Sequence, residues 1–267
     1  MTRIFEHSST DGDIPVRVLL ALAERAQVQG RQWVVVGAAA RDLLVHVPLG
    51  HPPTRATTDI DIAIAVAVER EFQDFAEGLP SLDAGIHKFA VHGIEVDIVP
   101  FGAIEVDGSI RFPNDHVLDV IGLREAALDP DIVVLPNGVP IPVAPAEVQV
   151  ALKLLAWRDR HRYVSKDALD LRTLLAASSE GHYADEAWED EEALEACGYM
   201  IDLAGAYRFG RLASSRFTVE RAQPVLDLLR ASADVLTLKA EMGGRAPGEQ
   251  LDAYHRGFEV GLRPAEP

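Results

Sequence analysis

The 267-residue chain has little cysteine, little positive charge and no long hydrophobic run. Cys197 is the only cysteine, which excludes an internal disulfide, and its place in a helical stretch indicates a buried packing thiol. No apolar stretch approaches the roughly 20 residues of a membrane helix, and the first residues lack the apolar segment of a signal peptide. We therefore expect a cytoplasmic protein that does not enter the membrane. The nine histidines form no His-Glu-x-x-His pattern and are expected to be surface or core residues.

Positive charge is scarce, since 25 Lys and Arg stand against 42 Asp and Glu, a formal charge of −17. Neutralising phosphates supplies most non-specific affinity for nucleic acid, so a uniformly acidic surface would repel RNA. The charge is uneven, however. A basic cluster that could hold an acceptor comprises Arg158, Arg160, Arg162, Lys166 and Arg172. An acidic run, residues 185–195, has seven acids and no Lys or Arg, and fits either an interface for a basic partner or a solvated helix face.

The most informative stretch is Asp59-Ile60-Asp61-Ile62, an acidic pair inside an apolar, β-prone run. Because side chains alternate across a strand, Asp59 and Asp61 point to one side, about 7 Å apart, while the isoleucines commit the other side to a core. Ionised carboxylates are almost never buried unpaired, so the acidic side needs a compensating partner. A divalent cation is the partner that this pattern favours.

A strand, a tight turn and a helix are predicted upstream of the acidic pair. Val34-Val35-Val36 is a β-branched run that ends at Gly37, and strong helix formers continue from Ala38 to Leu44. The start of a helix offers free N–H groups and a positive dipole end, and small residues let a phosphate approach the backbone. The turn is expected to hold a triphosphate, and the alternative is a tightly packed connection between strand and helix.

A third carboxylate is expected from Ile94-Glu95-Val96-Asp97, where acids again alternate with apolar residues. We choose Asp97, although Glu95 lies on the same face and stays open as the third acid or as the partner of an Arg. Three carboxylates can hold two Mg²⁺ ions, or Mn²⁺ in their place, about 3.5–4 Å apart. Such a site suits attack of a hydroxyl on the α-phosphate of a nucleoside triphosphate, with pyrophosphate leaving.

Two domains are expected, an α+β domain over residues 1–143 and an all-helical domain over residues 144–267. In the first domain, helices are expected near 14–29 and 69–78, with strands near 86–91, 94–99, 109–112, 131–135 and 139–143. Strand signals vanish after Pro145, and helices are expected at 145–161, 166–177, 184–212, 218–240 and 247–260.

These motifs together resemble the DNA polymerase β-like nucleotidyltransferase superfamily, whose pattern is a Gly-Gly or Gly-Ser turn, an Asp-x-Asp strand and a third acid. Residues 36–44, 58–62 and 96–98 carry the resemblance. It implies a small mixed sheet flanked by helices, with Asp59, Asp61 and Asp97 as catalytic metal ligands. It also implies a nucleotide site at Gly37, Ala38 and Arg41. Ala38 departs from the pattern, because the family has Gly or Ser there and a hydroxyl contact to the phosphates is lost.

A narrower resemblance is to AbiEii-like nucleotidyltransferases, the enzymatic half of bacterial type IV toxin–antitoxin pairs. It spans about residues 32 to 175 and adds the segments 144–147, 153–158 and 166–171 to the motifs above. It implies that Lys153 and Asp167 complete the active site, that Lys153 also contacts the nucleotide, and that the helical domain contacts the acceptor. From the residues alone, Lys153 could equally lie along the core edge with its ammonium in water. Asp167 and Asp170 share one helical face, which could be solvated or paired with Lys166 or Arg172.

The expected function is a metal-dependent nucleotidyltransferase that moves a nucleoside monophosphate from a nucleoside triphosphate to RNA, at the 3′ end of tRNA. The enzyme would be the toxin of a pair, with an antitoxin protein as its partner. Two alternatives stay open. One is transfer to a small cationic acceptor of the aminoglycoside type, which the acidic surface would attract. The other is a non-catalytic binding module that kept the fold, suggested by Ala38.

Overall fold

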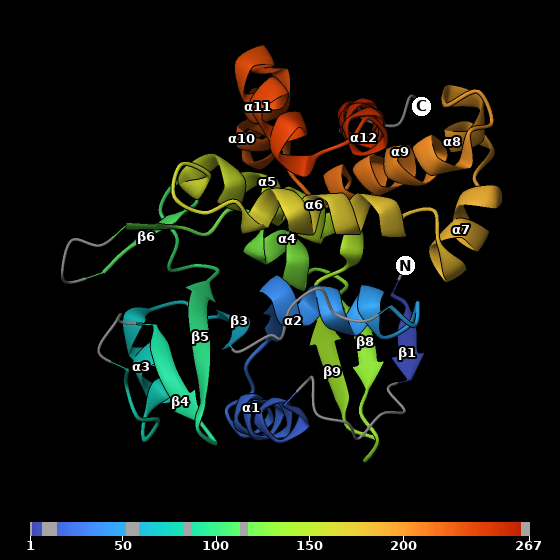
Figure 1. The fold of residues 1–267 in the computed structure, drawn as a ribbon. Coiled ribbons are helices and arrows are strands. Elements are labelled where there is room, and N and C mark those ends of the chain that lie inside the picture. Colours follow the sequence, from blue (N-terminus) through green and yellow to red (C-terminus); the bar gives the residue numbers. More distant parts are fainter. Residues whose placement is uncertain (1, 7–14, 52–58, 83–86, 113–116, 263–267) are drawn as a thin grey trace, which may run out of the picture. The chain divides into compact units, whose positions relative to one another are not determined.

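The computed structural model describes residues 2–6, 15–51, 59–82, 87–112 and 117–262. The chain divides into two compact units, unit 1 over Met1–Pro145 and unit 2 over Ala146–Pro267. Unit 1 combines a mixed sheet with short helices, whereas the described part of unit 2 contains only helices among its regular elements (Figure 1). The predicted α+β class, with a mixed sheet flanked by helices and a helical second part, is confirmed.

Unit 1 is built on a seven-stranded sheet with the order β1-β8-β9-β2-β3-β5-β4. Its strands are β1 (Ile4–Glu6), β2 (Trp33–Val36), β3 (Asp59–Ala65), β4 (Lys88–Val91), β5 (Ile94–Phe101), β8 (Asp131–Val134) and β9 (Pro140–Val143). The interior strand β3 runs antiparallel to β2 and parallel to β5, so the two acidic strands are neighbours. A separate ribbon pairs β6 (Ser109–Arg111) with β7 (Val117–Asp119).

The helices of unit 1 are short, and one of them continues as a π-helical turn. They are α1 (Val16–Val28), α2 (Gly37–Arg41) with the π-helical turn η1 (Asp42–His46), α3 (Glu69–Ala76) and α4 (Leu123–Ala127). The isoleucines of β3, Ile60, Ile62 and Ile64, are fully buried, as their alternation with the acids predicts. The core face of β3 therefore fixes which way Asp59 and Asp61 point.

Three elements of unit 1 have no counterpart among the sequence predictions: β1, β7 and α4. They are only three to five residues long. A segment of this length is too short to show a periodic hydrophobic pattern, which is the main signal of secondary structure in a sequence. The longer elements were found because their patterns repeat.

Unit 2 packs eight helices in its described part. They are α5 (Ala146–Arg160), α6 (Lys166–Ala177), α7 (Gly181–Trp188), α8 (Glu191–Ala196), α9 (Ile201–Ser214), α10 (Val219–Arg230), α11 (Ser232–Met242) and α12 (Ala246–Gly261). Glycines let α9 and α12 approach closely, since a Cβ on Gly210 would lie 2.0 Å from the carbonyl oxygen of Tyr254. On α12, a Cβ on Gly257 would lie 1.9 Å from the carbonyl oxygen of Tyr207. Backbone-to-backbone packing thus joins these two helices.

The single helices expected over 184–212 and 218–240 are wrong, because each stretch is divided. Asp190 caps α8 by accepting a hydrogen bond from the backbone N–H of Ala193 at 3.1 Å. Gly198 and Tyr199 then both adopt positive φ, at 60° and 61°, which ends α8. Between α10 and α11 the backbone of Ala231 is extended, and an alanine gives no sequence signal for such a break.

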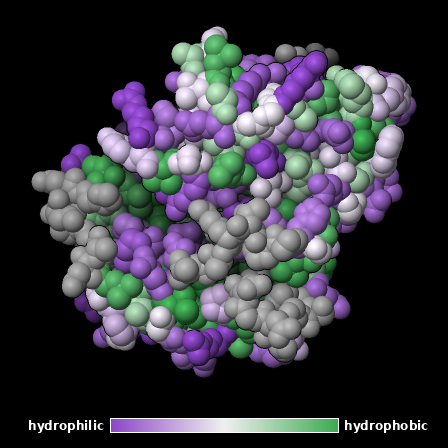
Figure 2. Space-filling view, in the orientation of Figure 1, coloured by the Kyte–Doolittle hydropathy of each residue, from purple (hydrophilic) through white to green (hydrophobic). Residues whose placement is uncertain are grey.

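No helix in the described ranges is long and apolar enough to cross a membrane. On the face shown in Figure 2, hydrophobic residues form small patches between hydrophilic ones. Cys197 is buried, as expected of a packing thiol, and Nη2 of Arg256 lies 3.8 Å from its Sγ. Burial raises the pKa of this thiol, which disfavours the reactive thiolate.

Candidate active site

Two neighbouring strands of unit 1 present four carboxylates on one face of the sheet. Asp59 lies in register with Glu95, and Asp61 with Asp97, because β3 and β5 run parallel. Adjacent strands are about 4.8 Å apart and alternate residues about 7 Å apart, so these four positions form a compact acidic patch. All four side chains are partly exposed. The structure thus brings together the three acids proposed from the sequence, with Glu95 as the fourth member of the acidic patch.

Gly37 brings the turn after β2 against the acidic patch. Val36 lies in register with Asp61, and the next residue, Gly37, has a φ of +69°. A Cβ on Gly37 would lie 2.0 Å from Oδ2 of Asp61. Glycine is therefore required twice here, for its conformation and for space. Gly37 and Ala38 are partly exposed at the start of α2, the position predicted to receive phosphates.

Arg41 is buried at the end of α2. Its guanidinium is fully shielded from solvent and donates to Oδ1 of Asp42 from Nε at 3.0 Å and from Nη2 at 2.6 Å. Nε2 of His46 lies 3.7 Å from the same oxygen. These contacts join α2 to the π-helical turn that follows it. The contact predicted between Arg41 and a nucleotide stays a prediction.

Lys88 is a member of the site that sequence reasoning missed. It lies on β4 in register with Asp97, and its Nζ is 3.0 Å from Oδ1 of Asp97. The same ammonium donates a hydrogen bond to Oε1 of Glu95. Burial by itself lowers the pKa of Lys88, but the two carboxylates raise it well above its ordinary value. The acidic patch therefore contains a permanent positive charge.

The register of the β4–β5 hairpin could have revealed Lys88 in advance. Its turn consists of His92 and Gly93, with φ of 51° and 80°, the conformation of a tight two-residue hairpin turn. Counting outwards from such a turn places position 88 opposite position 97, as the strands pair here. The strands expected near 86–91 and 94–99 already leave two residues between them, so the cross-strand partner of Asp97 follows from counting back across His92 and Gly93.

The donor set of the acidic patch suits a hard divalent cation, because Mg²⁺ prefers carboxylate oxygens. Within the described residues, however, no three side chains of His, Cys, Asp or Glu converge as a ready-made metal site. Lys88 accounts for this at Asp97, since its ammonium already contacts that carboxylate. Metal binding by Asp59, Asp61 and Asp97 stays a prediction.

Unit 2 contains a second group of charges, the ion cluster, formed by Lys153 and Arg160 of α5 and Asp167 and Asp170 of α6. Nζ of Lys153 lies 3.2 Å from Oδ1 of Asp167 and 2.7 Å from Oδ2 of Asp170. Arg160 donates two hydrogen bonds to Asp167, from Nε at 2.6 Å and from Nη2 at 2.8 Å. The ion cluster therefore links α5 to α6 through two cations and two carboxylates.

The sequence left open whether Lys153, Asp167 and Asp170 are solvated or paired, and the burial of the ion cluster decides this. Only 9% of the Lys153 side chain is exposed, so its ammonium is not in open water. Asp167 and Asp170 do share one helical face, but that face is buried and pairs with Lys153. Burial by itself raises the pKa of Asp167, and Arg160 with Lys153 lowers it below its ordinary value overall. Asp167 is therefore a structural carboxylate of unit 2, and its action in catalysis with Lys153 stays a prediction.

Comparison with known proteins identifies the family. Residues 20–215 match the family described as nucleotidyl transferase AbiEii toxin, type IV TA system. The chain belongs to the AbiEii nucleotidyltransferase family. The resemblance inferred from the Gly37 turn, the acidic strand and the helical motifs is thereby confirmed, as is its class of activity.

Other comparisons add little to this assignment. No curated protein matches the chain. Among solved structures, the antibiotic-resistance factor ANT(2'')-Ia is similar over 70% of this chain and 98% of its own, with a TM-score of 0.38 and 15% sequence identity. Similarity this low does not bear on the acceptor.

Part of the basic cluster of this AbiEii-family chain is neutralised within unit 2. Nε of Arg158 lies 2.8 Å from Oδ1 of Asp159, and Arg160 is held by Asp167. Arg162, by contrast, is exposed in the turn after α5, next to Tyr163, whose surface is 88% exposed. The positive charge offered to an acceptor is therefore smaller than the sequence suggests, and Arg162 is one of its exposed members.

The acidic run is also partly neutralised, by two arginines of α9. Nη1 of Arg208 lies 2.7 Å from Oε2 of Glu186, and Nη1 of Arg211 lies 3.3 Å from Oε2 of Glu192. Both arginines also pair with Asp190. These ion pairs hold α7 and α8 against α9, which favours a structural role over an interface for three of the seven acids, Glu186, Asp190 and Glu192.

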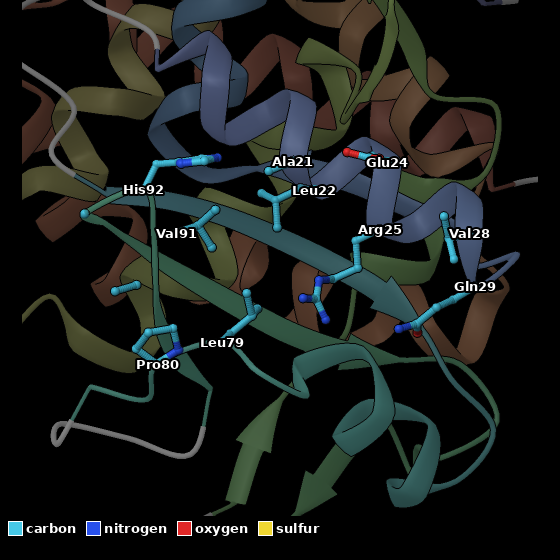
Figure 3. Close-up of a pocket in the computed structure, with 12 residues that line it drawn as sticks. Ala21, Leu22, Glu24, Arg25, Val28, Gln29, Leu79, Pro80, Val91 and His92 are labelled. Atoms are coloured by element: carbon cyan, nitrogen blue, oxygen red, sulfur yellow. The ribbon is translucent and has the colours of Figure 1, made fainter.

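Unit 1 also contains a cavity of about 850 Å³ lined by α1, by the segment after α3 and by the end of β4 (Figure 3). Two of its polar side chains, Arg25 and Gln29, are already engaged. Nη1 of Arg25 donates to the carbonyl oxygens of Phe75 and Glu77 at 2.7 and 2.9 Å. Nε2 of Gln29 donates to the carbonyl oxygen of Asp74 at 3.0 Å. These bonds satisfy open carbonyls at the end of α3, so Arg25 and Gln29 serve the fold.

Proposed function

We propose that this AbiEii-family nucleotidyltransferase uses divalent metal to move a nucleoside monophosphate from a nucleoside triphosphate to a hydroxyl of RNA. The expected acceptor is the 3′ end of tRNA, and the expected cellular role is that of a cytoplasmic toxin with an antitoxin partner. The observation that carries the proposal is the acidic patch, where Asp59, Asp61 and Asp97 occupy adjacent positions on neighbouring strands. Carboxylates in this arrangement fit the chemistry of phosphoryl transfer.

The three acids would have different roles in the reaction. Asp59 and Asp61 would hold the cation that accompanies the triphosphate, since they share a face of β3. Asp97 would accept the proton of the attacking hydroxyl of the acceptor. The oxygen of that hydroxyl would bond to the α-phosphorus as the bond from the α-phosphorus to pyrophosphate breaks. Mg²⁺ bound at the acidic patch would neutralise the triphosphate and lower the pKa of the hydroxyl. The register between Asp61 and Asp97 supports this division, because it puts base and metal ligand side by side.

The turn after β2 supports a nucleotide site next to these acids. Gly37 lies in van der Waals reach of Asp61, and neither Gly37 nor Ala38 has a side chain that would keep a phosphate from the backbone. Ala38 has no hydroxyl, so backbone N–H groups would supply the contacts there. Arg41 would act indirectly, by fixing the end of α2 through Asp42.

Unit 2 would contribute Lys153 and Asp167 to the reaction and an exposed turn to the acceptor. The ammonium of Lys153 has three N–H donors, and its contacts with Asp167 and Asp170 leave one for a phosphate oxygen. Arg162 and Tyr163 combine an exposed cation with an exposed aromatic ring, the pair of features that holds single-stranded nucleic acid. Their exposure favours RNA over a small acceptor.

One experiment tests donor, acceptor and metal together. The protein is incubated with each labelled nucleoside triphosphate in turn, with total RNA, purified tRNA or an aminoglycoside, and with Mg²⁺ or a chelator. We expect label on RNA that depends on Mg²⁺ and is absent from folded Asp61→Asn. Label on the aminoglycoside alone would replace the RNA acceptor by a small molecule. Full activity of Asp61→Asn would contradict the proposed use of the acidic patch.

The exposed turn has its own test within the same assay. Arg162→Ala combined with Tyr163→Ala should weaken RNA binding and reduce its salt dependence, with a slope change of about 0.7–0.9 for the lost phosphate contact. Arg158→Ala is the matched control, because Arg158 already pairs with Asp159. Equal effects of the two changes would argue that the turn is not the acceptor surface.

A further inference from the structure

Lys88 occupies one side of the acidic patch. We propose that Lys88 is a built-in competitor for the divalent cation at Asp97, so that the nucleotide-free protein holds one ion firmly, on Asp59 and Asp61, and a second only weakly. This inference rests on the metal-dependent function proposed above. It assigns Lys88 a role in setting metal affinity, acting through Asp97.

The contacts of Lys88 place its charge where a second ion would have to bind. Nζ lies 3.0 Å from Oδ1 of Asp97 and also contacts Glu95. The pairing between β4 and β5 holds the Lys88 backbone opposite Asp97, so the ammonium stays near that carboxylate. A Mg²⁺ ligand lies about 2.1 Å from its ion, so an ion bound to the same oxygen would lie within a few ångströms of the ammonium unless Lys88 shifts.

Electrostatics makes this competition strong. A single and a double positive charge a few ångströms apart repel each other at a half-buried site, where the effective dielectric is well below that of water. Only 24% of the Lys88 side chain is exposed, so solvent screens this repulsion incompletely. Removing the charge of Lys88 should therefore strengthen binding of a divalent ion at Asp97.

Glu95 gives Lys88 an alternative partner when an ion takes Asp97. Glu95 lies two positions before Asp97 on the same face of β5, and Lys88 contacts both. If the ammonium moves entirely to Glu95, the carboxylate of Asp97 becomes available without leaving an unpaired Lys. Glu95 thus favours metal binding although it is not itself the proposed ligand.

The test is a titration with Mn²⁺, followed by the electron paramagnetic resonance signal of the free ion, in the full-length protein without nucleotide. Lys88→Met should raise the affinity of the weaker site by about tenfold or more. Lys88→Arg keeps the charge and should retain the wild-type titration. Glu95→Gln should weaken the second site, and this effect should disappear in the double variant with Lys88→Met.

Each outcome bears on the inference. If Asp61→Asn loses Mn²⁺ binding while Lys88→Met titrates like the wild type or binds less, the competitor role of Lys88 is overturned and the metal-dependent function stands. If neither the wild type nor Lys88→Met binds Mn²⁺, both fail together. Circular dichroism checks folding, and if Lys88→Met does not fold, the neutral Lys88→Gln takes its place, with Glu95→Gln against wild type as an independent arm.

Discussion

Gly37 and Asp61 are in contact in a way that leaves no room for a side chain between them, since a Cβ on Gly37 would lie 2.0 Å from Oδ2 of Asp61. The contact follows from the pairing of β2 with β3, which sets Val36 opposite Asp61 and starts the turn immediately afterwards. A group bound at this turn would therefore lie beside the first acidic strand. Two motifs some twenty residues apart in the sequence lie side by side for this geometric reason.

We predict that Gly37→Ala lowers both stability and transfer activity. The alanine would have to adopt a φ of +69° and would also displace the carboxylate of Asp61. A left-handed conformation costs a non-glycine residue about 1–2 kcal/mol, and the collision adds to that cost. Urea unfolding measures the stability loss, and label transfer to RNA measures activity.

Gly78→Ala is the matched control for this prediction. Gly78 has a φ of +76°, but no atom lies within 4 Å of the position of its Cβ. The control should therefore show the conformational cost alone and leave transfer unchanged. If the two variants lost the same stability and kept the same activity, the contact between Gly37 and Asp61 would have no energetic or functional weight.

We predict that Asp97→Ala abolishes transfer while nucleotide binding persists, because the triphosphate depends on Asp59 and Asp61. Loss of a general base alone costs about 10²–10⁴ in rate, and loss of metal placement adds to it. Lys88 retains Glu95 as a partner in this variant, so folding should survive. Single-turnover kinetics and nucleotide titration separate the two effects.

Glu95→Gln is the control for Asp97, and its effect should be mild and repaired by higher Mg²⁺. The reason is that Glu95 acts on the metal only by holding Lys88 away from Asp97. An inactive Glu95→Gln beside an active Asp97→Ala, both folded, would mean that Glu95 is the third acid. The choice between these two residues, left open by the sequence, would then be reversed.

The acidic strands were predictable because their chemistry is local. Alternation of acid and isoleucine fixes one face of β3 as core and the other as acidic, without knowledge of any partner strand. Lys88 was also within reach, since a two-residue hairpin turn fixes its position opposite Asp97. The two-residue turn fixes the register between β4 and β5, and counting residues from the turn gives the partner of Asp97.

Other features depend on packing that no local pattern reports. Arg41 looks like a surface residue of a short helix, yet it is fully buried against Asp42. Arg160 reads as part of a basic cluster, whereas it closes an ion pair with Asp167 on the next helix. The break at Ala231 has no Gly or Pro to mark it. For Arg160, the contact with Asp167 on the next helix overrode the preference of the local sequence.

We predict that Lys153→Met destabilises the protein by about 3–5 kcal/mol, because it removes the buried cation that contacts both Asp167 and Asp170. Asp167 would keep Arg160, but Asp170 would lose its contact with Nζ of Lys153 at 2.7 Å. Arg158→Met is the control, since its pair with Asp159 is partly exposed and should contribute no more than about 1 kcal/mol. Similar unfolding midpoints in urea for both variants would show that the ion cluster does not stabilise unit 2.

Asp167 should make the stability of the protein depend on pH in the acid range. Arg160 and Lys153 outweigh the effect of burial and lower the pKa of Asp167 below its ordinary value of 3.8. A carboxyl group with a lowered pKa in the folded state stabilises the fold fully above its ordinary value, and this contribution is lost as the pH falls through the lowered pKa. Asp167→Asn should therefore be less stable than wild type at pH 7, and the gap between them should narrow as the pH falls below 3.8. Urea unfolding from pH 7 into this acid range checks the slope. A constant gap at all pH values would mean that Asp167 stabilises unit 2 by packing rather than by charge.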